Sequence, residues 1–77
     1  MNIVIYTKTN CPNCEYAKNL LKSKGLAYEE DNLDAPALMS AFQRMYPEVR
    51  QMPQIFIKGQ RVGGLAGLQV ALKELGL

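Results

Sequence analysis

The chain has 77 residues, of which 48% are hydrophobic, so it can form one small core but not two. We therefore expect a single domain over residues 1–77. Nine basic and seven acidic residues leave a net charge of +2, without the basic, aromatic-interleaved runs of a nucleic-acid surface. No apolar run approaches the ~20 residues of a membrane span, and the first is too short for a signal peptide, so we expect a soluble, cytoplasmic protein. Histidine is absent, which excludes Cys-His zinc sites and Ser-His or Cys-His catalytic pairs.

The first third of the chain predicts a strand, a helix and a turn. Residues 2–6 (N-I-V-I-Y) are rich in β-branched side chains without polar alternation, a pattern typical of a central parallel strand buried on both faces. Residues 7–10 form a polar loop, and Pro12 can occupy the first turn of a helix that runs to about Lys24. Gly25 is placed to end that helix. The core-facing stripe of this helix comprises Cys14, Ala17, Leu20 and Leu21.

The middle of the chain predicts a second strand and a second helix. Residues 26–32 read as a strand that ends in an acidic cluster, which we interpret as a solvated face. The cluster comprises Glu29, Glu30, Asp31 and Asp34. Asp34 can cap a helix over residues 35–46, and Pro47 ends it. The apolar stripe of this helix comprises Leu38, Met39, Phe42 and Met45.

The last third predicts a hairpin and a third helix. Residues 54–57 and 61–63 read as antiparallel strands joined by a Lys58-Gly59 turn. The pair Gly63-Gly64 breaks the second strand. A core-facing helix follows, with Leu65, Leu68, Leu72 and Leu75 on its inner side. The order βαβαββα predicts an α/β fold with a four-stranded mixed sheet flanked by helices.

The cysteine pair indicates redox chemistry. A bridge between Cys11 and Cys14 closes a very small loop and would stabilise the fold little, whereas a C-x-x-C that follows a strand and opens a helix is typical of a thioredoxin-like redox motif. Cys11, at the helix N-terminus, is the expected nucleophile. Lys8 is a candidate cation beside its thiolate, or else an ordinary solvated lysine. Two cysteines in one chain do not complete a structural zinc site or an iron-sulfur cluster.

Three separated motifs closely resemble the glutaredoxins of the two-cysteine, C-P-x-C type, which have the thioredoxin-like fold. These motifs are Y-T-K-T-N-C-P-N-C, M-P-Q-I-F-I-K-G and V-G-G-L. The resemblance implies that Cys11 attacks a disulfide or a glutathione mixed disulfide and that Cys14 resolves the protein-bound intermediate. It also implies glutathione as a co-substrate, with no bound metal.

The resemblance further implies a set of glutathione-binding residues. Met52, before a cis-proline at Pro53, would offer its backbone N–H and C=O to the cysteinyl part of glutathione. The Gly63-Gly64 pair would present the N–H groups of the next helix to a carboxylate, or else would only break the strand. The whole set comprises Lys8, Pro12, Asn13, Arg50, Gln51, Met52, Pro53, Gly63, Gly64, Leu65 and Ala66, with Arg61 as a weaker carboxylate partner.

Two positions depart from the family pattern. Asn13 stands where glutaredoxins commonly carry an aromatic residue, so stacking on glutathione is lost. Gly67 stands at or near the position of an acidic residue that often holds the γ-glutamyl ammonium. We expect Gly67→Asp to tighten glutathione use, without loss of stability unless Gly67 has a positive φ.

The sequence is compatible with three functions. The first is a glutathione-dependent oxidoreductase that acts on protein disulfides and glutathionylated proteins, with ribonucleotide reductase as an acceptor by family analogy. The second is a redoxin of similar fold recycled by thioredoxin reductase. The third is a carrier of a [2Fe–2S] cluster held by Cys11 of two chains and two glutathiones. We expect a monomer with no nucleic-acid or membrane partner.

Overall fold

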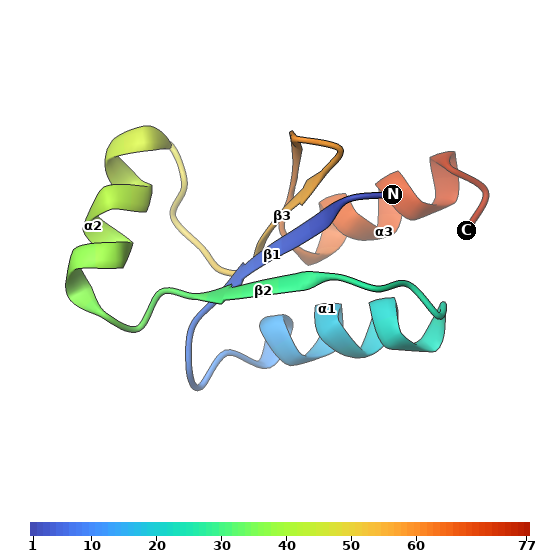
Figure 1. The fold of residues 1–77 in the computed structure, drawn as a ribbon, viewed down its shortest axis with the longest axis horizontal. Helices are drawn as coiled ribbons and strands as arrows, with labels where there is room; N and C mark the ends of the chain where they lie inside the picture. The colour runs from blue at the N-terminus through green and yellow to red at the C-terminus, as the bar shows by residue number, and fades with distance from the viewer.

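The computed structural model describes all of residues 1–77 and confirms the predicted order of elements (Figure 1). The elements are β1 (Ile3–Thr7), α1 (Pro12–Ser23), β2 (Glu29–Asn32), α2 (Pro36–Met45), β3 (Gln54–Ile57), β4 (Gln60–Gly63) and α3 (Leu65–Glu74). The fold is α/β, with one mixed sheet. No helix has the length and apolar character to cross a membrane.

The four strands lie in the order β2-β1-β3-β4, so that β1 is central, as predicted. β1 pairs in parallel with β2, where Val4 is opposite Glu29, and antiparallel with β3, where Ile5 is opposite Ile55. The β3–β4 hairpin completes the sheet. β1 and β2 therefore end at the same edge, and the loops that follow them are neighbours there.

One face of the sheet carries the larger core, covered by α1 and α3. Alternate side chains of β1 and β3 meet the apolar stripes of the two helices. This core comprises Ile3, Ile5, Ala17, Leu21, Ile55, Ile57, Leu68 and Leu72. The intervening β1 side chains, Val4 and Tyr6, are only half-buried, so the prediction of a strand buried on both faces is wrong for the second face.

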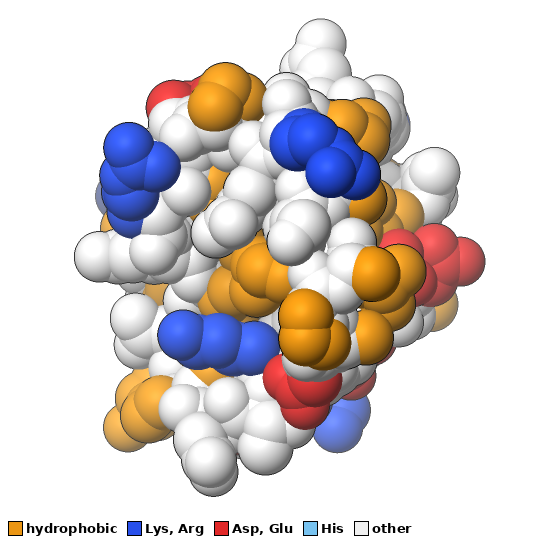
Figure 2. Space-filling model, turned by 90° about the vertical axis from the view of Figure 1, so that its left-hand side faces the viewer, with side chains coloured by type: hydrophobic (Ala, Val, Ile, Leu, Met, Phe, Trp, Pro, Cys, Tyr) orange, Lys and Arg blue, Asp and Glu red, His pale blue; other side chains and the backbone are white.

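The second face is covered only in part, by α2. Phe42 is the one buried residue of α2, and the centroid of its ring lies 4.8 Å from that of Tyr6 and 5.0 Å from that of Tyr46. Leu38 and Met45 are 52% and 69% exposed, so the predicted core-facing stripe is wrong at these two positions. Figure 2, viewed from the side on which α2 lies, shows apolar side chains exposed on that side of the molecule.

Three predicted boundaries or contacts also differ. Pairing of the second strand begins at Glu29 rather than near residue 26, because the parallel register with β1 starts there. The residue at the N-cap of α2 is Ala35, which makes no side-chain capping bond, because the Asp34 carboxylate binds the Thr9 backbone and hydroxyl instead. Leu75 follows the end of α3 and is 46% exposed.

Candidate active site

The two cysteines form a disulfide at the N-terminus of α1, with their Cα atoms 5.2 Å apart. Cys11 is the N-cap residue, and its Sγ lies 3.1 Å from the backbone nitrogen of Cys14, whose N–H it accepts. Pro12 occupies the first turn, where its missing N–H leaves no bond unmade. A helix N-terminus favours a negative charge, so this position stabilises the thiolate of Cys11 once the disulfide is reduced.

The two sulfurs differ in access. Cys11 lines both cavities that flank the motif, whereas Cys14 lines neither and is fully buried. Cys11 is itself 8% exposed in the disulfide form. An incoming disulfide can therefore reach Cys11 first, and the sulfur within reach of Cys14 is Cys11 Sγ itself.

The Met52-side cavity, of about 370 Å³, holds most of the predicted glutathione-binding residues from the first two motifs. Lys8, Asn10, Cys11 and Pro12 line it together with Asn13, Arg50, Gln51 and Met52. Its walls carry two cationic side chains and no acidic one. The cavity therefore suits a ligand with carboxylates and a thiol or disulfide group.

The Met52–Pro53 peptide bond is cis, as the family resemblance implies. Met52 is largely buried, and its carbonyl oxygen lies 3.6 Å from Cys11 Sγ. The backbone of Met52 thus borders the reactive sulfur, where it can align an extended peptide-like group with Cys11.

The loop before Met52 is held by its own polar contacts. Arg50 Nη1 donates to the carbonyl of Pro47 at 2.9 Å, and Gln54 Nε2 donates to the carbonyl of Gln51 at 2.9 Å. Gln54 is buried, and its Oε1 has no hydrogen-bond partner. Arg61, the weaker candidate for a carboxylate, is engaged elsewhere: it pairs with Glu48 and lies 5.6 Å from the ring centroid of Tyr46.

The residues of the third motif stand apart from both cavities. Neither the Met52-side cavity nor the other cavity that Cys11 lines, on the β2 side, is lined by Gly63, Gly64, Leu65 or Ala66. A Cβ at Gly64 would lie 3.3 Å from the carbonyl oxygen of Pro53, so the glycine lets the start of α3 approach the cis-proline closely. The role of these four residues toward a carboxylate remains a prediction.

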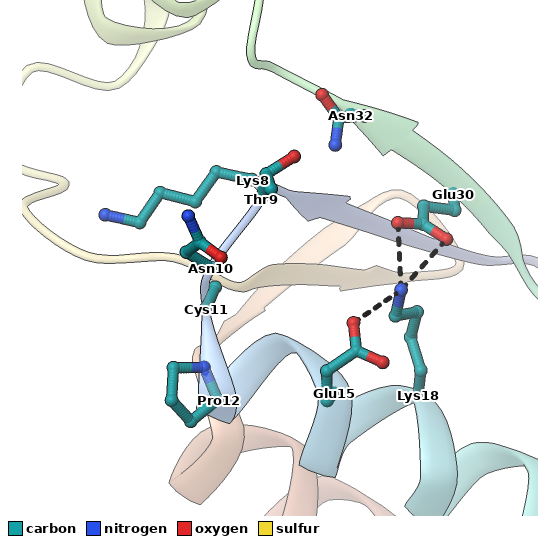
Figure 3. Close-up of a pocket in the computed structure, with 9 residues that line it drawn as sticks. All are labelled: Lys8, Thr9, Asn10, Cys11, Pro12, Glu15, Lys18, Glu30 and Asn32. Atoms are coloured by element: carbon teal, nitrogen blue, oxygen red, sulfur yellow. Dashed lines mark hydrogen bonds and ion pairs between the residues drawn. The ribbon is translucent and has the colours of Figure 1, made fainter.

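The β2-side cavity, of about 600 Å³, contains side chains that the sequence reading did not assign to the site (Figure 3). Besides Lys8, Cys11 and Pro12 it is lined by Thr9, Asn10, Glu15, Lys18, Glu30 and Asn32. Lys18 lies on α1 and Glu30 on β2, 12 residues apart, and the packing of α1 against the sheet brings them together. No local spacing in the sequence signals this contact.

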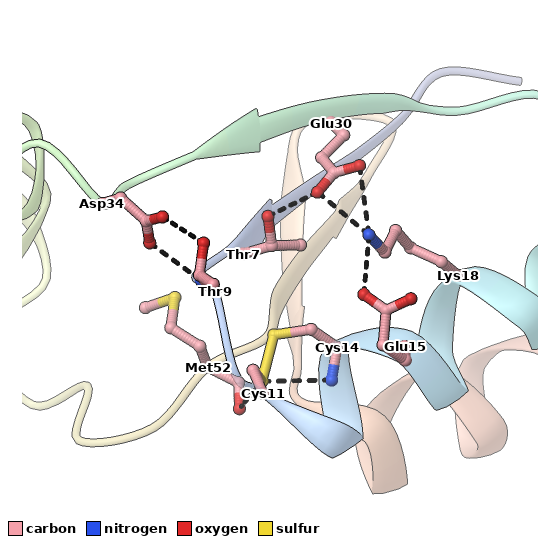
Figure 4. Close-up of polar contacts among 9 residues, drawn as sticks. All are labelled: Thr7, Thr9, Cys11, Cys14, Glu15, Lys18, Glu30, Asp34 and Met52. Carbon is pink, nitrogen blue, oxygen red and sulfur yellow. Dashed lines mark hydrogen bonds and ion pairs between the residues drawn. A yellow bond between two sulfur atoms is a disulfide. The ribbon is translucent and has the colours of Figure 1, made fainter.

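A charged network organises this second cavity. Lys18 Nζ lies 2.9 Å from Glu15 Oε2 and 3.2 Å from Glu30 Oε2, and the buried Thr7 hydroxyl donates to Glu30 at 2.6 Å (Figure 4). The Thr7 hydroxyl first, and then Lys18, lowers the pKa of Glu30. The bond to Glu15, and secondarily Glu30, raises the pKa of Lys18. Part of the acidic cluster is therefore paired rather than merely solvated.

A central strand followed by a C-x-x-C at a helix N-terminus, beside a cis-proline, defines a thiol-disulfide oxidoreductase of the thioredoxin-like class. No group of three or more His, Cys, Asp or Glu side chains is arranged to hold a metal ion. The glutaredoxin family model matches residues 3–62. The chain belongs to the glutaredoxin family.

Individual relatives agree with this assignment. Glutaredoxin 3 of Escherichia coli (strain K12) is 41% identical over 63 residues, which cover 82% of this chain and 76% of the relative. The structure of glutaredoxin 1 from Francisella tularensis, complexed with cacodylate, has a TM-score of 0.84 at 30% identity and covers 99% of this chain and 98% of its own.

Two further solved structures bear on function. A buckwheat glutaredoxin–glutathione complex has a TM-score of 0.79 at 26% identity, covering 94% of this chain and 68% of its own. The Escherichia coli NrdH-redoxin, a glutaredoxin-like protein with a thioredoxin-like activity profile, has a TM-score of 0.75 at 25% identity and covers 92% of each chain.

Proposed function

We propose that the protein is a glutathione-dependent oxidoreductase that reduces protein disulfides and glutathione mixed disulfides through the Cys11/Cys14 couple. The observation that carries the proposal is the position of Cys11, which borders a cation-walled cavity next to the Met52 carbonyl while Cys14 lies buried behind it. We further propose that residues 1–77 act as one domain, as a cytoplasmic monomer.

The dithiol cycle begins with attack of the Cys11 thiolate on one sulfur of a protein disulfide, which releases the other sulfur as a thiolate. Cys14 then loses its proton and attacks Cys11 Sγ, releasing the second substrate thiol and forming the Cys11–Cys14 disulfide seen in the structure. One glutathione opens that disulfide at Cys11, and a second removes the first as glutathione disulfide. The sum oxidises two glutathiones and reduces one disulfide.

Stabilisation of the Cys11 thiolate comes from several groups. A thiol of pKa ~8.5 is only a few per cent ionised at neutral pH, and lowering that pKa by ~3 units takes about 4 kcal/mol of preferential stabilisation of the anion. The helix dipole supplies ~0.3–1 kcal/mol, and up to ~2 in partly buried geometries. The Cys14 N–H, 3.1 Å from Cys11 Sγ, and Lys8 in the shared cavity wall are the groups that can supply the rest.

Glutathione fits the chemistry of the Met52-side cavity. It is a tripeptide with two carboxylates, one ammonium and a thiol, and this cavity offers Lys8 and Arg50 to carboxylates and the Met52 backbone to a peptide. The buckwheat neighbour of similar fold was solved with glutathione bound. By family analogy, we propose a disulfide of ribonucleotide reductase as one acceptor.

A second candidate is a redoxin recycled by thioredoxin reductase. Two observations favour it: Asn13 supplies no aromatic face to the Met52-side cavity, and the NrdH-redoxin neighbour has a thioredoxin-like activity profile. A comparison of recycling systems separates the two. With a small disulfide as substrate, glutathione plus glutathione reductase and NADPH should support turnover, and thioredoxin reductase plus NADPH should not. The reverse result would assign the protein to the second candidate.

A further inference from the structure

We propose that Asp34 is a positioning residue for Cys11, fastening the loop that carries the reactive sulfur to the segment that follows β2. The inference rests on the proposed function only in taking Cys11 as the attacking thiol. It concerns a side chain that lies outside both cavities and makes no ion pair.

The Asp34 carboxylate binds two groups of a single loop residue, Thr9. Its Oδ1 accepts the Thr9 backbone N–H at 2.8 Å, and its Oδ2 accepts the Thr9 hydroxyl (Figure 4). The N–H of Asp34 in turn donates to Asn32 Oδ1 at 2.8 Å, and Leu33 N–H donates to the Thr7 carbonyl at 2.8 Å. The segment after β2 is therefore tied to the end of β1 at Thr7 and to the loop that follows at Thr9, while the Asn32 bond fixes Asp34 within its own segment.

The loop needs such a restraint because of its backbone. Residues 8–10 are exposed and form no helix or strand. Asn10, immediately before Cys11, has φ of +57°, in the left-handed region that a residue with a side chain rarely occupies. Cys11 then places its Sγ on the Cys14 N–H with an extended backbone at φ of −124°. Because Asn10 links Thr9 directly to Cys11, a shift of the Thr9 backbone would displace Cys11 Sγ.

Loss of the Asp34 charge and loss of its bonds to Thr9 should shift the pKa of the Cys11 thiol in opposite directions, which makes the proposal testable. The two Thr9 bonds lower the pKa of Asp34, so the carboxylate is ionised at neutral pH. A nearby negative charge disfavours a thiolate, so loss of the charge alone should lower the pKa of the Cys11 thiol. Loss of positioning should raise it, because the Cys14 N–H bond to the sulfur weakens.

The experiment measures the pH dependence of Cys11 alkylation by iodoacetamide in the full-length protein. It is done in a Cys14→Ser background, where Cys11 is the only thiol, and without glutathione, so that failure of the proposed co-substrate does not affect the result. We expect Asp34→Ala to raise the alkylation pKa by about half to one unit.

Three companion variants define the outcome. Asp34→Asn, which keeps an acceptor for the Thr9 N–H, and Thr9→Ser, which keeps both bonds, should not raise the alkylation pKa. Glu29→Ala removes an exposed charge of β2 that makes no ion pair, and should leave the alkylation pKa unchanged.

A folded Asp34→Ala protein whose alkylation pKa is unchanged or lower would overturn the proposal, even if it melts earlier. Should Asp34→Ala not fold, Asp34→Glu decides, because it keeps the charge but moves both acceptor oxygens away from Thr9. A raised alkylation pKa supports positioning, and an unchanged one refutes it.

Discussion

Gly67→Ala tests a close approach of α3 to β4 at Val62. A Cβ at Gly67 would overlap the carbonyl oxygen of Val62 and lie 2.9 Å from its carbonyl carbon. Both of these Val62 atoms belong to the backbone, which cannot move aside as a flexible side chain can. The loss in unfolding free energy therefore falls at the upper end of the ~1–3 kcal/mol typical of overpacking. Alanine recovers about 1 kcal/mol of helix propensity, which leaves a net loss of about 2 kcal/mol. For a domain of this size that is a fall in Tm of roughly 8–16 °C.

The measurement is thermal unfolding of the reduced protein, followed by circular dichroism. Gln69→Ala, at an exposed position of the same helix, is the matched control and should change stability by no more than ~0.5 kcal/mol. A Gly67→Ala protein as stable as the parent would show that α3 does not approach Val62 as closely as described. The same contact corrects the expectation that Gly67→Asp leaves stability intact. The reason is steric, since Gly67 is not among the glycines with positive φ.

Three further predictions concern stability. The pKa values of Glu30 and Asp34 are lowered in the folded protein, so their contribution is present above pH 4.5 and is lost as the pH falls through the lowered values; urea unfolding at pH 7, 5 and 3 should show the loss. The raised pKa of Lys18 has the opposite sign: its contribution is complete below pH 10.5 and lost above it, and Lys18→Met should flatten the alkaline fall in urea midpoint. Phe42→Ala should cost ~3–5 kcal/mol in urea unfolding, and Leu38→Ala, at a 52% exposed position of the same helix, less than ~1; equal losses would contradict the described packing of α2.

The order of elements was predictable because each one has a local signal. The β-branched run before Cys11, Pro12 in the first turn and the leucine spacing after Gly64 each specify an element without reference to the rest of the chain. The start of β2 was not predictable in this way. The parallel register begins at the Val4–Glu29 pair although β1 itself begins at Ile3, and no feature of residues 26–28 marks that start.

The same distinction applies to side chains. Periodicity marks Leu38 and Met45 as one stripe with Phe42, but it does not say how much of that stripe another element covers. Asp34 has the residue type of a helix cap, yet its partner comes from 25 positions away in the sequence. The redox pair could be read from its spacing and its place between a strand and a helix, whereas the cis bond before Pro53 came only from the family resemblance.

The central claim is that glutathione works through Cys11 while Cys14 serves the dithiol route. The most direct test compares Cys14→Ser with the parent protein, using glutathione, glutathione reductase and NADPH, on a glutathionylated peptide and on a protein disulfide. We expect Cys14→Ser to retain turnover of the glutathionylated peptide and to lose reduction of the protein disulfide, while Cys11→Ser loses both. Equal loss of both activities in Cys14→Ser would contradict a glutathione-dependent mechanism and favour a thioredoxin-like cycle.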